Sequence, residues 1–177
     1  NLNDYSSEFR RHLAEETSSL EILEMLADDK DPEVRRVVAI FLHDSKILDK
    51  LATDDVWQVR EGVAGNPHTS AKTLNKLADD ENMRIRTKVA RNSNTLFATL
   101  IRLADDRELS IRISVARNLN APSEALDMLA DDVMSLVRQS VVENPNTSLE
   151  MLEKLAADDN KMVRKRAGQK LKKNKSS

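Results

Sequence analysis

The residues in this chain best suited to chemistry are an aspartate and an arginine six positions apart, as in Asp106 and Arg112. A carboxylate can ligate a metal ion or act as a general base, and a guanidinium can hold an anionic group through its rigid fork of donors. An active site needs one such constellation in one place. The same pair occurs six times in this chain, so it has to be considered together with the elements that carry it.

The repeated pair follows a Leu-Ala dipeptide whose leucine recurs at intervals of 25 or 26 residues. These leucines are Leu26, Leu51, Leu77, Leu103, Leu129 and Leu155. The pairs share the same period: Asp29 and Arg35, Asp54 and Arg60, Asp80 and Arg86, Asp106 and Arg112, Asp132 and Arg138, and Asp158 and Arg164. A pair that recurs with the period of the scaffold serves the scaffold. We therefore interpret these residues as a structural ladder and predict no catalytic residue.

Each copy contains two helical patterns. The first has leucines three residues apart, such as Leu152 and Leu155, and the second has a four-residue apolar step, such as Ile111 and Val115. Two helices of about nine residues are marginal alone, so the copies must stack on one another. Stacking places the aspartates and arginines in columns, where we expect each arginine to reach the aspartate of its own copy, that of a neighbour, and turn carbonyls.

The composition favours an all-α protein without a cofactor. Of the 177 residues 40% are apolar but only 3% aromatic, and there are three glycines, which favours helices over a β-sandwich. The net charge of −2 provides no global field to hold DNA or an anionic membrane. The absence of cysteine excludes disulfides and thiolate chemistry, and no apolar run approaches the ~20 residues that span a bilayer. We expect a cytoplasmic monomer that does not bind a membrane.

The repeat motifs resemble those of the leucine-rich repeat variant family. Leu-Ala-x-Asp, Val-Arg-x-x-Val-Ala and Asn-Pro-x-Thr follow one another over about residues 18–171. The resemblance implies a right-handed superhelical solenoid of about six 26-residue repeats, in which α-helices alternate with short 3₁₀-helices. The ladder is also similar to that of HEAT repeats, although their period is about 40 residues. Some family members carry an iron–sulfur module on cysteines, which this chain lacks. No common reaction follows from the resemblance.

Three segments are expected along the chain: an N-terminal helical cap at 1–17, the solenoid at 18–171, and a basic tail at 172–177. Phe9 and Leu13 stand four residues apart and are predicted to face inward over the first copy. After Asp159 the chain has eight lysines or arginines and no acid. This end is either a solvated cap, whose cations suit a helix C-terminus, or a segment that contacts phosphates.

The expected function is that of a non-enzymatic scaffold presenting a concave surface to a protein partner. Positions that vary between copies gather Lys88, Arg91 and Arg117, and Arg84 lies one helical turn before Lys88. With Trp57 these residues form the predicted binding surface. This surface suits an acidic protein segment or, second, phosphates, although a solvated helix face would show the same pattern. The alternative function is nucleic-acid binding of the kind found in helical-repeat DNA-repair glycosylases, which would need an aromatic residue and an acid on a basic face.

Other candidate sites are weaker. His43 and His68 fall at equivalent places in adjacent copies, but no third ligand shares their spacing, so we interpret them as turn residues and predict no metal. The doubled acids that close each Leu-Ala segment lack the ligand loop of an EF-hand and are interpreted as ladder and solvated turn residues. Glycine-rich phosphate loops, Ser-His-Asp arrangements and HExxH motifs are absent from the sequence.

Overall fold

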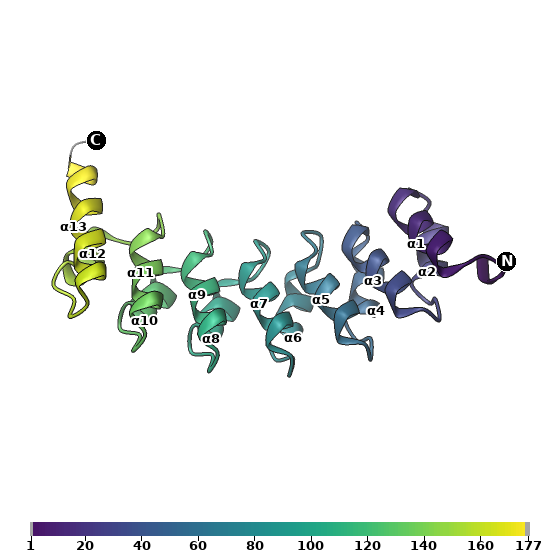
Figure 1. Ribbon diagram of the computed structural model, residues 1–177, viewed down its shortest axis with the longest axis horizontal. Coiled ribbons are helices and arrows are strands. Elements are labelled where there is room, and N and C mark those ends of the chain that lie inside the picture. The colour runs from purple at the N-terminus through teal and green to yellow at the C-terminus, as the bar shows by residue number, and fades with distance from the viewer. Residues whose placement is uncertain (1, 176–177) are drawn as a thin grey trace. The chain divides into compact units, whose positions relative to one another are not determined.

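The computed structural model describes residues 2–175, and these residues form helices joined by turns, without a strand (Figure 1). The prediction of an all-α fold is therefore confirmed. The chain divides into two compact units, residues 1–94 and residues 95–177. None of the helices within 2–175 is both long and apolar enough to cross a membrane.

In the first unit, long helices contact one another in chain order, and a short helix lies beside each of them (Figure 1). The long helices are α1 (Ser7–Glu16), α3 (Pro32–Phe41), α5 (Trp57–Gly65) and α7 (Met83–Arg91). The short ones are α2 (Leu20–Leu26), α4 (Ser45–Leu51) and α6 (Ala71–Leu77), and a 3₁₀ turn, η1 (Leu2–Asp4), precedes them all.

The second unit repeats this arrangement. Its long helices are α9 (Leu109–Arg117), α11 (Ser135–Glu143) and α13 (Lys161–Lys175), and its short helices are α8 (Phe97–Ala104), α10 (Ser123–Ala130) and α12 (Leu149–Leu155). Helix α11 contacts both α9 and α13. The boundary expected between solenoid and tail at 171 and 172 falls inside α13, and residues 176–177 lie outside the described residues.

The core of each unit is built from columns of equivalent residues. The leucine of every Leu-Ala dipeptide is buried, and so are the branched apolar residues of the long helices, such as Val34, Val59 and Ile85. Because these side chains recur at the helical spacing, each helix presents one apolar stripe to the neighbouring copies and leaves the opposite face to solvent. That solvent-facing side of the long helices is where residues are free to vary.

The family resemblance implied 3₁₀-helices in alternation with α-helices, and here the structure differs. Within residues 2–175 both helices of every copy are α-helical, and the one 3₁₀ segment is η1. The short helices have only seven or eight residues, about two turns, and they tighten at their ends. After α2, for example, the N–H groups of Asp28 and Asp29 donate to carbonyls three residues back. Their 3₁₀ character is confined to this last turn.

Candidate functional site

The ladder arginines join consecutive copies. In the first unit Arg35 donates two hydrogen bonds to the Asp54 carboxylate of the next copy, one from Nε at 2.7 Å and one from Nη2 at 3.0 Å. The Nη1 atom of Arg35 donates to the main-chain carbonyl of Asp29, in its own copy, at 2.7 Å. Arg60 repeats the pattern with the Asp80 carboxylate at 2.8 Å. The expected contact with the aspartate of the same copy is made to that residue's backbone oxygen, and the carboxylate that each of these arginines binds belongs to the next copy.

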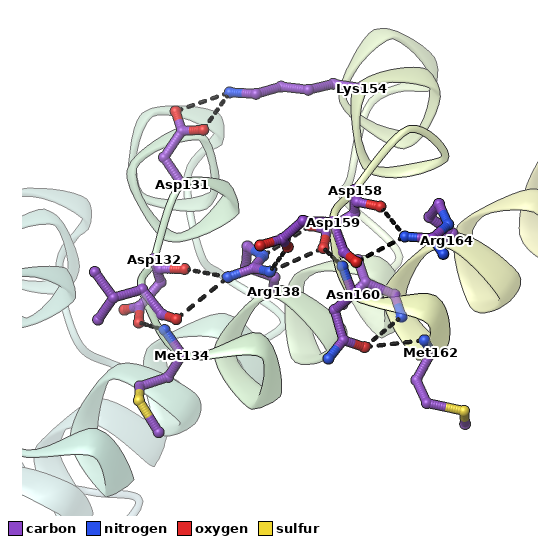
Figure 2. A network of polar contacts seen from close by, with 12 residues as sticks. Asp131, Asp132, Met134, Arg138, Lys154, Asp158, Asp159, Asn160, Met162 and Arg164 are labelled. Atoms are coloured by element: carbon purple, nitrogen blue, oxygen red, sulfur yellow. Dashed lines mark hydrogen bonds and ion pairs between the residues drawn. The ribbon is translucent and has the colours of Figure 1, made fainter.

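The second unit has the same geometry (Figure 2). Arg112 donates to the Asp132 carboxylate at 2.6 Å and to the Asp106 carbonyl at 2.9 Å. Arg138 likewise donates to the Asp158 carboxylate at 2.7 Å and to the Asp132 carbonyl. Figure 2 also shows the bond from Arg138 to Asp159, the solvent-side member of that doubled acid. Each bridge is bidentate, the arrangement in which a guanidinium and a carboxylate bind most strongly.

The ladder carboxylates also build the turns that begin the long helices. Asp54 accepts the main-chain N–H of Val56 at 2.9 Å, and Val56 is an N-cap residue whose own side chain cannot accept a hydrogen bond. The same bond, two residues along the chain, occurs in every copy. The donors are the N–H groups of Asp31, Val56, Asn82, Glu108, Met134 and Asn160. One aspartate thus fixes both a local turn and the stacking of its copy on the preceding one.

The ladder begins with Arg10, a residue absent from our predicted set. Arg10 lies on α1 and is 2% exposed, and its Nε donates to the Asp29 carboxylate at 2.6 Å. It stands 25 residues before Arg35, so extending the arginine period by one step would have identified it. The prediction that Phe9 faces inward is wrong: Phe9 is 45% exposed and stacks on Tyr5, while Arg10 and Ala14 take the buried positions.

The bridges shift the acidity of the ladder carboxylates. Burial alone would raise the pKa of Asp54, but hydrogen bonds from Arg35 and the Val56 N–H hold it below its ordinary value. The pKa values of Asp29 and Asp80 are lowered by the same balance. At Asp158 the hydrogen bond from Arg138 is the largest influence and lowers the pKa to about 2. These four carboxylates are therefore ionised at neutral pH.

We expect acid to weaken the ladder. A carboxylate whose folded-state pKa is depressed contributes stability above its unfolded pKa of about 3.9 and loses it as the pH falls through the folded value. The free energy of unfolding should stay nearly constant from about pH 7 to pH 5 and fall between about pH 4 and pH 2. Urea unfolding at stepped pH measures this. Asp158→Asn has no charge to lose at that position, so its fall should be shallower, and equal slopes would contradict the assignment.

The outer acid of each doublet faces solvent. Asp28 pairs with Lys50 at 2.5 Å and Asp131 with Lys154 at 2.6 Å, and all four side chains are more than half exposed. Such exposed pairs contribute little to stability. Within residues 2–175 no three His, Asp or Glu side chains are grouped as metal ligands. The rings of His43 and His68 do lie together, with centroids 4.3 Å apart.

A second polar column lies where the long helices end. The buried Asn66 side chain donates from Nδ2 to the carbonyls of Ala39 at 2.8 Å and Leu42 at 2.7 Å, in the preceding copy. Its Oδ1 accepts the N–H of His68 at 2.8 Å. Asn92 and Asn144 make equivalent bonds to the copies before them. These asparagines satisfy helix-end carbonyls that would otherwise be buried without partners.

The predicted binding surface divides between the two units. Arg84, Lys88 and Arg91 lie on α7, and Trp57 lies at the start of α5, all in the first unit. The Arg84 guanidinium lies over the Trp57 ring, 5.3 Å from its centroid, a cation–π contact. Arg117 is exposed on α9, in the second unit. The residues that the structure brings together are thus the α7 cations and Trp57.

A hollow of about 230 Å³ opens on this face of the first unit, which sequence analysis did not locate. Gly62 and Gly65 of α5 line it, with Arg36 and Ile40 of α3 on one side and Lys88 of α7 on the other. A Cβ at Gly62 would lie 3.1 Å from the Ala39 Cβ and 3.3 Å from the Arg36 carbonyl oxygen, so glycine here permits the close approach of α5 to α3. At Gly65 the nearest atom would be Lys88 Cδ, at 3.6 Å.

Comparisons with known proteins agree with the repeat assignment. The profile of the family described as leucine rich repeat variant matches residues 136–160. A solved structure described as a leucine-rich repeat variant with a novel repetitive protein structural motif is 28% identical, with a TM-score of 0.75. The alignment covers 96% of this chain and 68% of that one. An engineered protein, 17% identical with a TM-score of 0.55 over 90% of this chain and 98% of its own, shares the fold. No match is found among curated proteins.

Proposed function

We propose that this chain is a binding scaffold without an enzymatic activity of its own. Its repeats are those of the leucine-rich repeat variant family, as the motifs predicted. We further propose that the face made by α3, α5 and α7 binds an acidic segment of a partner protein. The observation that carries this proposal is the hollow at Gly62 and Gly65, with a cation on each side of it.

The hollow is suited to accept an acidic side chain of the partner protein. Gly65 leaves the exposed end of α5 without a side chain, Gly62 lets α5 approach α3 closely, and the Lys88 stem passes over Gly65. Lys88 is exposed and has no ion-pair partner among residues 2–175, so its ammonium group is available to a ligand. Arg36, on the other side, pairs with Glu33 at 2.9 Å and keeps 38% of its side chain exposed. Ile40 adds an apolar surface, which suits the methylene groups of a glutamate or aspartate.

Arg84 and Trp57 extend the surface beyond the hollow. The contact with the indole ring limits the rotamers of the long Arg84 side chain, and its outer donors remain available for carboxylate oxygens. Arg36 on α3 and the two cations Arg84 and Lys88 on α7 attract an acidic segment at long range and raise its association rate. Glu61, at the edge of the hollow, offsets part of this positive charge. The attraction between exposed charges should weaken with added salt.

Trp57 is the only tryptophan in the chain, which makes its fluorescence a reporter for this face. We expect a twelve-residue peptide of glutamates with interspersed leucines to change that fluorescence saturably, because its carboxylates bind the Arg84 guanidinium that lies over the ring. Binding should weaken at least tenfold between about 50 and 300 mM salt. The double variant Arg84→Glu and Lys88→Glu should abolish it, while each substitution changes stability by less than about 0.5 kcal/mol.

The matched controls separate this face from general charge effects. The double variant Lys72→Glu and Lys76→Glu makes the same charge change on the exposed side of α6 and should leave the affinity unchanged. Gly65→Leu should fill the hollow and weaken binding without altering any charge. Undiminished binding to the double variant would overturn the proposed surface. Tighter binding of a DNA or RNA oligonucleotide than of the acidic peptide would instead favour the nucleic-acid alternative.

A further inference from the structure

The asparagine column is interrupted at its N-terminal end. Asn66 is the residue that directly follows α5, and the residue that directly follows α3 is Leu42. Leu42 is 2% exposed and its side chain has no hydrogen-bond donor. The donor that links each copy to the one before it is therefore missing where α3 meets α1.

The acceptors that such a donor would meet are still in place. Asn66 bonds the carbonyls of Ala39 and Leu42, and the residues 25 positions before these are Ala14 and Thr17, at the end of α1. Within residues 2–175 neither the Ala14 nor the Thr17 carbonyl accepts a hydrogen bond. Carbonyls at a helix C-terminus carry the negative end of the helix dipole and favour a cationic donor.

A cavity of about 530 Å³ opens at this position, and Ala14 and Thr17 line it. The carboxylate-bearing residues Glu15 and Asp44 line it as well. Its apolar walls include Leu20 and Phe41, which are 47% and 51% exposed. Carbonyl oxygens and carboxylates beside an apolar wall match a ligand that has an ammonium group on a hydrocarbon chain.

The chain itself shows that this ligand fits the repeat. Lys170 stands 26 residues after Asn144, in the next position of the asparagine column. Its Nζ donates to the Val142 carbonyl at 2.8 Å and to the Asn144 carbonyl at 2.5 Å. A four-carbon chain ending in an ammonium group thus donates, at one end of the column, to the carbonyls whose equivalents at the other end, those of Ala14 and Thr17, receive no donor from Leu42.

We propose that the cavity beside Leu42 binds a primary alkylammonium group on an unbranched chain, the chemistry of a lysine side chain. The carbonyls of Ala14 and Thr17 accept hydrogen bonds from the ammonium, Glu15 and Asp44 balance its charge, and the alkyl chain lies against Leu20 and Phe41. The site shares no residue with the hollow at Gly62, so it does not depend on the scaffold function proposed above.

The test is a titration of ¹⁵N-labelled protein followed by NMR, with 1,5-diaminopentane and with lysine capped at both its main-chain ends. Both probes should shift the amide signals of Ala14, Thr17 and His43 saturably. The neutral analogue n-pentanol should bind at least tenfold more weakly, and equal binding of n-pentanol would overturn the proposal. Tighter binding of capped lysine would indicate a polypeptide as the source of the amine, and tighter binding of the diamine would indicate a free polyamine.

Variants locate the site. Leu42→Lys places an ammonium in the position that Lys170 occupies in the last copy, and Leu42→Asn restores the Asn66 arrangement, so both should abolish binding by giving the carbonyls of Ala14 and Thr17 a donor from the chain itself. Because Leu42 is buried, Glu15→Gln and Asp44→Asn provide tests that leave the core intact. Asparagine is as good an N-cap as aspartate for α4, so Asp44→Asn should keep the fold. Each should weaken amine binding about fivefold or more, and unchanged binding in both would overturn the proposal.

Discussion

Replacing Asp54 with alanine is expected to lower the free energy of unfolding by about 2–3 kcal/mol. The substitution leaves the Arg35 guanidinium without its carboxylate and releases the Val56 N–H that starts α5. Truncating one partner of a fully buried pair costs about 3–5 kcal/mol. We expect a loss of only about 2–3 kcal/mol here because the Arg35 side chain remains 17% exposed. Urea-induced unfolding followed by circular dichroism measures the loss.

The neighbouring acid provides a matched control. Asp55 has the same side chain, one residue along, and is exposed, so Asp55→Ala should cost less than about 0.5 kcal/mol. A double-mutant cycle with Arg35→Ala should give a coupling energy of about 1–2 kcal/mol. Additive losses, or equal effects at Asp54 and Asp55, would mean that the ladder is a row of solvated charges.

Replacing Asn66 with alanine should cost on the order of 3 kcal/mol. The variant removes the donor that satisfies the carbonyls of Ala39 and Leu42, and it also removes the acceptor of the His68 N–H. Asn66→Asp should be worse than Asn66→Ala, because it brings a carboxylate against these carbonyls in a position that is only 2% exposed. Both effects are measured by urea unfolding.

Asn94 is the corresponding control, since its amide also donates to a carbonyl of the preceding copy, that of Pro67, but from an exposed position. Asn94→Ala should cost less than about 1 kcal/mol. Hydrogen exchange should show that Asn66→Ala opens the junction of α3 and α5 before the rest of the first unit. If Asn66→Ala and Asn94→Ala have the same effect, the buried asparagine column does not stabilise the stack.

The sequence was sufficient to predict the repeats, the ladder and the all-α fold, because all three follow from periodicity. It was insufficient for the pairing. Arg35 stands six residues from Asp29 and nineteen from Asp54, and only the stacked structure shows that it bonds the carbonyl of the first and the carboxylate of the second. Arg10 was within reach of the period but lay in a segment treated as a cap.

The binding surface was harder to predict for a related reason. Gly62 and Gly65 were recognisable as positions that vary between copies, but a hollow depends on what adjacent helices place beside them. Lys170 was missed for the same reason. It donates to the carbonyls of the preceding copy as the asparagines do, but because its residue type differs, the sequence pattern does not reveal that the contact is equivalent. Periodicity predicts which positions are equivalent, and contacts between copies decide what each position does.

The direction of the ladder has a consequence for how such a protein changes length. Each described bridge joins an arginine to the aspartate of the following copy, so inserting one complete 26-residue unit adds one arginine and one aspartate and creates one more bridge. Arg164 donates to carbonyls of its own copy and has no carboxylate partner within residues 2–175. The number of unmatched charges therefore stays the same however many units are duplicated or lost. Duplication or deletion of a whole unit therefore adds or removes ladder charges in matched pairs, and the ladder itself sets no particular number of units.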